Sequence, residues 1–183
     1  MDQPFFRRLF GHSPRPAPES PETLAEGGSA DAQFHLGLKC AHGGGAAQDY
    51  GRAAKWYLKA AQQNHALAQF NLAIMYATGQ GVSKDDAEAE MWFGRAARQG
   101  DPGAQHRLGL RRHRASIRDV PEKMREARIE AYKWFILAAA QGYGGSNVAR
   151  AAVALTMTFD DVTEATRRVE KFVPSVGGNS QAQ

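Results

Sequence analysis

Two consecutive stretches of 36 residues in this chain match each other, and this repetition constrains the fold more strongly than any other feature. Residues 30–65 align with residues 66–101 without a gap, so that Trp56 corresponds to Trp92 and alanine, glutamine, leucine and glycine recur at matching positions. A third copy begins at the same period, but its second half, marked by Trp134, comes six residues later. A fixed period of this length is typical of solenoids, in which each copy is a helix pair and neighbouring copies stack to bury a shared core.

Each copy predicts two helices. In the second copy Leu72 and Tyr76 lie four residues apart on one face, and Gly79 follows where a tight turn needs a permissive backbone. The second half of each copy places alanines at three- and four-residue spacing around the tryptophan, which is typical of a helix face in close contact with its neighbours. We therefore predict an all-α protein, an α/α solenoid with helix pairs at about residues 30–65, 66–101 and 102–142.

Capping patterns mark several helix starts independently of the apolar stripe. Ser83 and Asp86 have the spacing of a capping box, and so do Thr158 and Asp161. Asp101 is followed by a proline, the order expected at an N-cap and the first helical position. We expect helices to begin at these three points.

The two ends of the chain differ in composition from the repeats. Residues 13–29 contain four of the eight prolines together with Ser, Glu and Gly, a composition that buries too little apolar surface to offset the entropy of ordering. We therefore predict a disordered leader over residues 1–29 and a disordered tail over residues 175–183. Residues 4–10 combine aromatic and basic side chains, and two interpretations stay open: a weak contact with a membrane surface or, as we favour, a solvated tail.

The overall composition is that of a water-soluble globular protein. No apolar run approaches the roughly 20 residues of a membrane-spanning helix, and two arginines interrupt the N-terminal apolar stretch before a signal-peptide core could form. Cys40 is the only cysteine, so no internal disulfide is possible. We expect no transmembrane segment and a cytoplasmic location.

Residues 66–100, ALAQFNLAIMYATGQGVSKDDAEAEMWFGRAARQG, resemble a complete Sel-one-like repeat (SLR), the longer relative of the tetratricopeptide repeat. The resemblance rests on the order A-x-A-x-x-x-L-x-x-x-Y-x-x-G-x-G-V, an acidic residue, and A-x-x-W-F-x-x-A-A-x-x-G. Three copies cover roughly residues 30–142, and residues 146–174 are similar to the helices that close such arrays. The resemblance implies a right-handed superhelix over residues 30–174 that serves as a scaffold or adaptor and not as an enzyme.

The resemblance also implies where a partner would bind. In tetratricopeptide-like arrays the first helix of each copy lines a concave groove, and positions two, five, six and nine of the copy face into it. Transferred to this chain, these positions imply an apolar strip edged by histidine and arginine that holds a protein or peptide. The implied partner-binding residues are Asp31, Phe34, His35, Leu38, Leu67, Phe70, Asn71, Ile74, Gly103, His106, Arg107 and Leu110.

A basic segment in the third copy offers an alternative. Residues 111–128 contain seven arginines and lysines against three acids, a net charge of +4 that equals the formal charge of the whole chain. Such a lobe attracts nucleic acid or an acidic partner, although a charged run is more often a solvated face. Nucleic acid is the less favoured partner because the aromatic residues lie on the packing stripes and not among the arginines. The segment replaces the glycine turn of the other copies, so whether it is helix or loop stays open.

No pattern in the chain predicts catalysis or a cofactor. The motifs G-x-S-x-G, H-E-x-x-H and G-x-x-x-x-G-K-[ST] are absent. His35, Cys40 and His42 lie close in sequence, but on a helix Cys40 points away from the face of the two histidines, which argues against a metal site. The resemblance also brings a third function, a β-lactamase-type hydrolase. We favour it least, because the cysteine-rich relatives credited with that activity rely on paired cysteines and this chain has one.

Overall fold

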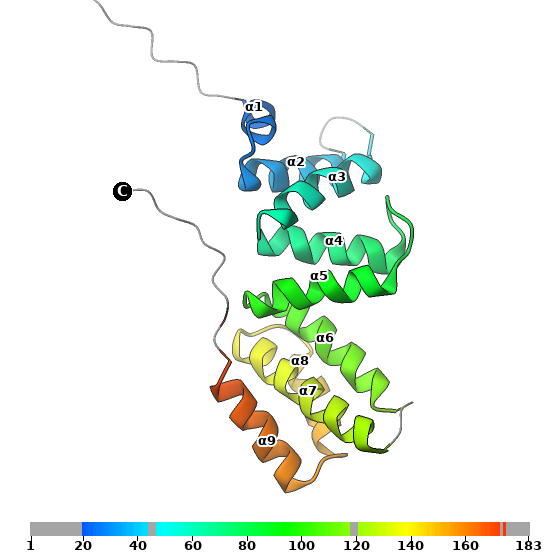
Figure 1. Ribbon diagram of the computed structural model, residues 1–183, viewed down its shortest axis with the longest axis vertical. Helices are drawn as coiled ribbons and strands as arrows, with labels where there is room; N and C mark the ends of the chain where they lie inside the picture. Colours follow the sequence, from blue (N-terminus) through cyan, green and yellow to red (C-terminus); the bar gives the residue numbers. More distant parts are fainter. Residues whose placement is uncertain (1–19, 44–46, 118–120, 173, 175–183) are drawn as a thin grey trace, which may run out of the picture.

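The computed structural model describes residues 20–43, 47–117, 121–172 and 174 (Figure 1). Within these ranges the chain forms nine α-helices and no strand. None of these helices is both long and apolar enough to cross a membrane. The helices are α1 (Pro21–Glu26), α2 (Ala30–His42), α3 (Tyr50–Gln62), α4 (Ala66–Thr78), α5 (Asp86–Arg98), α6 (Pro102–Ala115), α7 (Pro121–Ala140), α8 (Ser146–Ala154) and α9 (Phe159–Glu170).

Three helix pairs form the body of the molecule. α2 packs with α3, α4 with α5 and α6 with α7, and the second helix of the first two pairs packs against the first helix of the next pair. Figure 1 shows the pairs following one another along the long axis of the molecule. The arrangement confirms the predicted all-α, α/α solenoid, with helix pairs where the 36-residue period places them.

Small residues let neighbouring helix pairs come close together. The alanine pairs at 60–61 and 96–97 have no exposed surface. Trp92, which precedes the second pair on α5 and belongs to the same core cluster, is 4% exposed and donates its indole N–H to the Glu88 carboxylate at 3.0 Å. The burial of Trp92 confirms the packing role that its alanine neighbours predict.

A buried glutamine in the first helix of each copy ties three helices together. In the second copy the Gln69 side-chain amide donates to the Ala61 carbonyl of α3 at 3.0 Å, and its oxygen accepts a hydrogen bond from Gln99 after α5 at 2.7 Å. Gln33 and Gln105 make the same two bonds in the first and third copies. Because a buried polar group without a partner costs about 1–3 kcal/mol, these bonds favour one stacking geometry between copies.

The predicted disordered leader is wrong for residues 21–26, which form helix α1. Ala25 of this helix lies 36 residues before Ala61, is 1% exposed, and its carbonyl accepts the hydrogen bond from Gln33. α1 therefore packs on the first copy in the way that the end of α3, the second helix of the first copy, packs on the second copy. The rest of the predicted leader up to residue 19, the membrane contact at residues 4–10 and the tail at residues 175–183 lie outside the described residues.

The basic segment of the third copy is largely helical. Its first residues extend the end of α6, and residues 121–128 form the first turns of α7, whereas residues 118–120 lie outside the described part. α7 has 20 residues where α3 and α5 have 13, so the six additional residues mainly lengthen the second helix of this copy.

Two of the three predicted helix starts are confirmed. Asp101 caps α6 by accepting a hydrogen bond from the Ala104 N–H at 2.7 Å, and Thr158 with Asp161 forms a complete capping box on α9. The capping box predicted at Ser83 is wrong, because Asp85 is the N-cap of α5.

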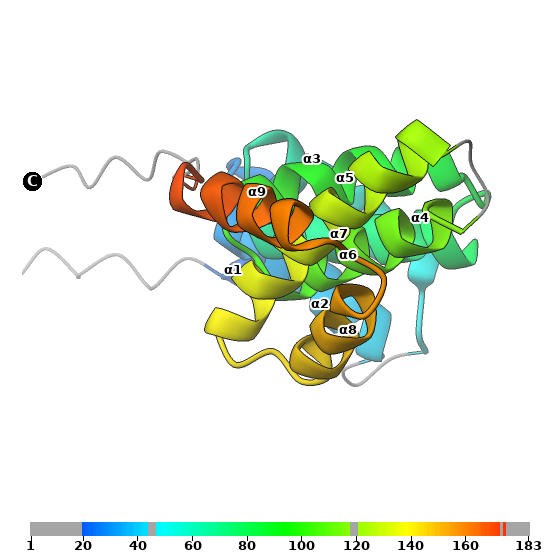
Figure 2. The same cartoon turned by 90° about the horizontal axis from the view of Figure 1, so that it is seen from below.

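Two further helices close the array after α7. α8 and α9 both contact α7, and Figure 2 shows them on different sides of it. Arg168 of α9 forms ion pairs with Glu126 and Glu130 of α7. Val148 of α8 and Leu155, which directly follows this helix, are largely exposed.

Candidate partner-binding groove

The implied groove residues of the first copy are divided between the core and the surface. Phe34 is 8% exposed, and its ring stacks on His65 with centroids 4.5 Å apart. Its assignment to the partner-binding surface is therefore wrong, because His65 and the α3 residue Tyr57 pack against the ring. His35 and Asp31 are exposed and Leu38 is half-buried, with Asp31 lying 3.3 Å from the His65 imidazole.

In the second copy the implied residues partly serve the stacking of the helices. The Phe70 ring lies 5.8 Å from that of Phe93 and also contacts the α-carbon side of Gly103, which has no room for a β-carbon. Asn71 is half-buried, and burial raises the pKa of the Tyr57 hydroxyl while Asn71 partly offsets this rise. The other two implied residues of this copy remain accessible: Leu67 is 50% exposed and Ile74 is half-buried.

In the third copy α8 covers one end of the groove. The His106 Nδ1 lies 2.9 Å from the Ser146 hydroxyl, and its ring contacts Phe135 and Tyr143. Burial, followed by the nearby Arg107 charge, lowers the pKa of His106. His106 is therefore mainly a packing residue, whereas Arg107 and Leu110, farther along α6, point to solvent.

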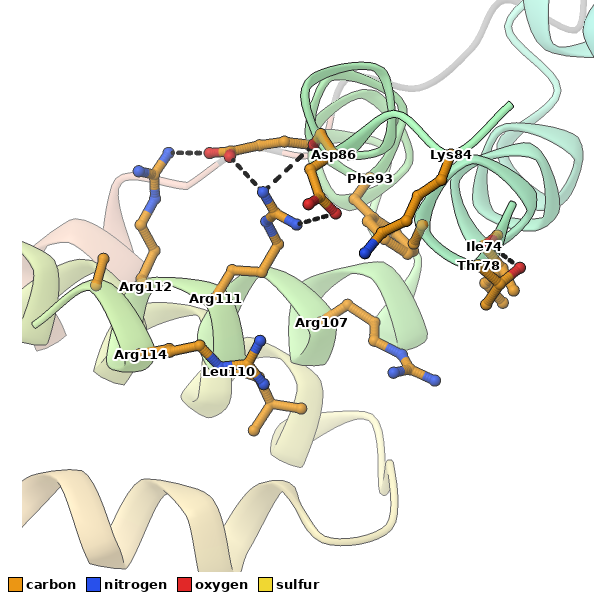
Figure 3. Close-up of a pocket in the computed structure, with 13 residues that line it drawn as sticks. Ile74, Thr78, Lys84, Asp86, Phe93, Arg107, Leu110, Arg111, Arg112 and Arg114 are labelled. Carbon is orange, nitrogen blue, oxygen red and sulfur yellow. Dashed lines mark hydrogen bonds and ion pairs between the residues drawn. The ribbon is translucent and has the colours of Figure 1, made fainter. Parts of the chain in front are cut away.

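The accessible residues of α4 and α6 meet at a cleft of about 560 Å³ (Figure 3). α4 contributes Ile74 and α6 contributes Arg107 and Leu110, three of the implied groove residues. Ala77 and Phe93 complete an apolar floor between these two helices. Leu110 is 37% exposed at the edge of this floor, so the cleft has accessible apolar surface.

The walls of the cleft are charged. Five cationic and two anionic side chains line it, a net charge of +3. They are Lys84, Arg107, Arg111, Arg112 and Arg114 with Asp86 and Glu90. The dashed lines in Figure 3 mark ion pairs that hold two of the arginines against α5: Arg111 lies 3.1 Å and Arg112 2.9 Å from the Glu90 carboxylate. Within the described residues, the other three cations have no ion pair.

The cleft joins the two surfaces that the sequence treats as alternatives. The groove positions supply its floor, and the start of the basic segment supplies a wall. Sequence reasoning missed Lys84 and Phe93, because Lys84 lies in the turn before α5 and Phe93 belongs to the packing stripe of a second helix. Only the packing of α5 between α4 and α6 brings them to this place.

Metal-binding side chains do not gather within the described residues. No group of three or more His, Cys, Asp or Glu side chains within them could hold a metal ion. Cys40 is half-buried and packs against the main hydrophobic core, with the contacts of a small apolar residue.

Comparison with known proteins places the chain in a class of helical repeat proteins. The model of the Sel1 repeat matches residues 30–65, 66–101 and 102–143, and the chain belongs to this family. The family generally mediates protein–protein interactions and is typically not enzymatic. The comparison with curated proteins gives no match.

Two solved structures share the fold. One is c5321, a protective antigen of uropathogenic Escherichia coli strains with an SLR fold, at 26% identity and a TM-score of 0.69. The match covers 89% of this chain and 35% of that protein, so this chain spans about a third of its length. The other is a Sel1 repeat protein from Oxalobacter formigenes, at 32% identity and a TM-score of 0.62, with coverage of 72% of this chain and 95% of that one.

Proposed function

We propose that the chain is a non-catalytic interaction module that holds a peptide or protein segment in the cleft between α4 and α6. The observation that carries the proposal is the exposed Leu110 beside the half-buried Ile74, on a floor that no other described segment covers. Apolar surface in a cleft is hard to explain by folding alone, because the core would be more stable with that surface buried.

Nucleic acid is the weaker candidate for this surface. Glu90 neutralises Arg111 and Arg112, and the buried Asp161 neutralises Arg125 at 2.6 Å. These pairs engage three of the seven basic side chains of the segment, which leaves fewer of them free to contact a phosphate backbone. The Phe93 ring in the cleft is 3% exposed, too little for a base to stack on it.

The proposal is tested by selecting binding peptides against the full chain by phage display and titrating the synthetic peptides. Ile74→Ser combined with Leu110→Ser should weaken binding by more than about tenfold, because burial of each aliphatic side chain contributes roughly 1.5–3 kcal/mol. These positions suit the test better than Phe70, whose contacts with Phe93 and Gly103 also serve stability.

A matched control replaces two equally apolar but distant side chains. Val148→Ser combined with Leu155→Ser removes exposed apolar surface from α8 and its C-cap, and should leave the affinity unchanged. Circular dichroism would check that both double variants remain folded. If the peptides kept their affinity for the cleft variant and lost it for the α8 variant, the binding surface would be at the end of the array and the proposal would fail.

A further inference from the structure

Three cations around the cleft have no partner in the described part of the chain. Lys84 extends from the turn before α5, and Arg107 and Arg114 extend from the solvent side of α6. Figure 3 shows them around the opening of the cleft, while Arg111 is held by the dashed contacts to α5. Side chains of this kind are available to a ligand without the prior loss of an internal ion pair.

From this geometry we infer that the cleft recognises an acidic peptide that carries one apolar side chain. The inference rests on the proposed function and adds the chemistry of the partner. The apolar side chain lies against Ile74 and Leu110, the accessible apolar residues of the cleft, and flanking carboxylates lie against Arg107, Arg114 and Lys84. Arginine suits this role because its planar guanidinium can donate two parallel hydrogen bonds to one carboxylate.

Charge complementarity favours acidic over neutral or basic segments. The cleft has a net charge of +3, and a basic peptide would place further positive charges beside its three unpaired cations. Asp86 and Glu90 would not repel the acidic peptide strongly, because the guanidinium of Arg111 lies against both and that of Arg112 against Glu90. The exposed position of the free cations also predicts that they raise the association rate and make binding sensitive to salt.

The inference is tested with three fluorescein-labelled peptides and the full chain, by fluorescence anisotropy at low ionic strength. The probes are the acidic GDELEDG, its neutral counterpart GNQLQNG and the acidic GDEGEDG, which lacks the leucine. The acidic leucine probe should bind about tenfold more tightly than the neutral probe, since two partly exposed ion pairs together reach about that factor. It should also bind at least about tenfold more tightly than the probe without leucine, because burial of a leucine side chain contributes roughly 1.5–3 kcal/mol. A single-stranded oligothymidine serves as the nucleic-acid probe.

Two pairs of charge-removing variants identify the surface. Arg107→Gln combined with Arg114→Gln should abolish the preference for the acidic probe. Lys55→Gln combined with Lys171→Gln removes the same net charge from exposed positions outside the cleft and should retain the preference. Retention of the preference in the arginine variant, or its loss in the control, would overturn the inference. Tighter binding of oligothymidine than of the acidic probe would overturn it in favour of nucleic acid.

The same experiment separates this inference from the proposed function. If the neutral leucine probe binds as tightly as the acidic one, and both lose affinity in the Ile74→Ser and Leu110→Ser variant, the cleft binds peptides but does not select acidic ones. If no probe and no display-selected peptide depends on Ile74 and Leu110, the proposed function fails together with the inference.

Discussion

The buried Gln69 gives the sharpest test of how the copies are joined. Its side chain is fully buried, donates to the Ala61 carbonyl and accepts from the Gln99 amide. Gln69→Leu keeps a similar volume and removes both hydrogen bonds. At about 1 kcal/mol for each bond, and up to about 3 kcal/mol for each buried group left without a partner, we expect the free energy of unfolding to fall by about 2–4 kcal/mol.

Urea unfolding followed by circular dichroism measures this change, with Gln62→Leu as the control on the exposed face of α3. Gln99→Leu alone should cost less, because its side chain is only half-buried and water can replace its partner. The double variant at 69 and 99 should cost less than the sum of the two single variants, by about 1 kcal/mol, since both lose the same bond. A cost below about 0.5 kcal/mol for Gln69→Leu would refute the idea that these bonds specify the stacking.

Two further properties follow from burial. Trp92→Ala should lower the free energy of unfolding by about 3–5 kcal/mol, as expected for a large aromatic removed from a core, and a change below about 1 kcal/mol in a reversible melt would contradict this. Burial lowers the pKa of both His65 and His106. The unfolded chain therefore binds more protons than the folded one, and the free energy of unfolding should fall as the pH drops below about 6.5. When both histidines are replaced by glutamine, the free energy of unfolding should change less between pH 7.5 and 5.5.

The fold was predictable because one period carries the information for every helix pair. The exception is α1, which composition assigned to a disordered leader. The sequence did contain a signal, because Gly28, Asn64 and Gly100 lie at the same position of the 36-residue period. In the structure all three have positive φ angles, of 99°, 65° and 96°. A six-residue helix is unstable by itself, and α1 is helical because Ala25 docks on α2. Composition does not report such tertiary contacts.

The candidate site was predictable only in part, because a helix position does not reveal what other elements cover it. Phe34 and His106 have the same place in their helices as Phe70, but His65 covers the first and α8 covers the second. Lys84 gave no signal, since it lies in a turn where the repeat pattern specifies no residue type.

The departures from the repeat, more than the repeat itself, give the cleft its chemistry. Leu38, Ile74 and Leu110 occupy equivalent positions, so an apolar strip is available in every copy. The positive charge is not repeated in this way, because the second copy has Asn71 and Thr78 at the positions equivalent to Arg107 and Arg114. A segment bound through apolar contacts alone could slide between equivalent copies at little cost. The arginines of the third copy break that equivalence, so an acidic segment has one favoured register, with its carboxylates at α6.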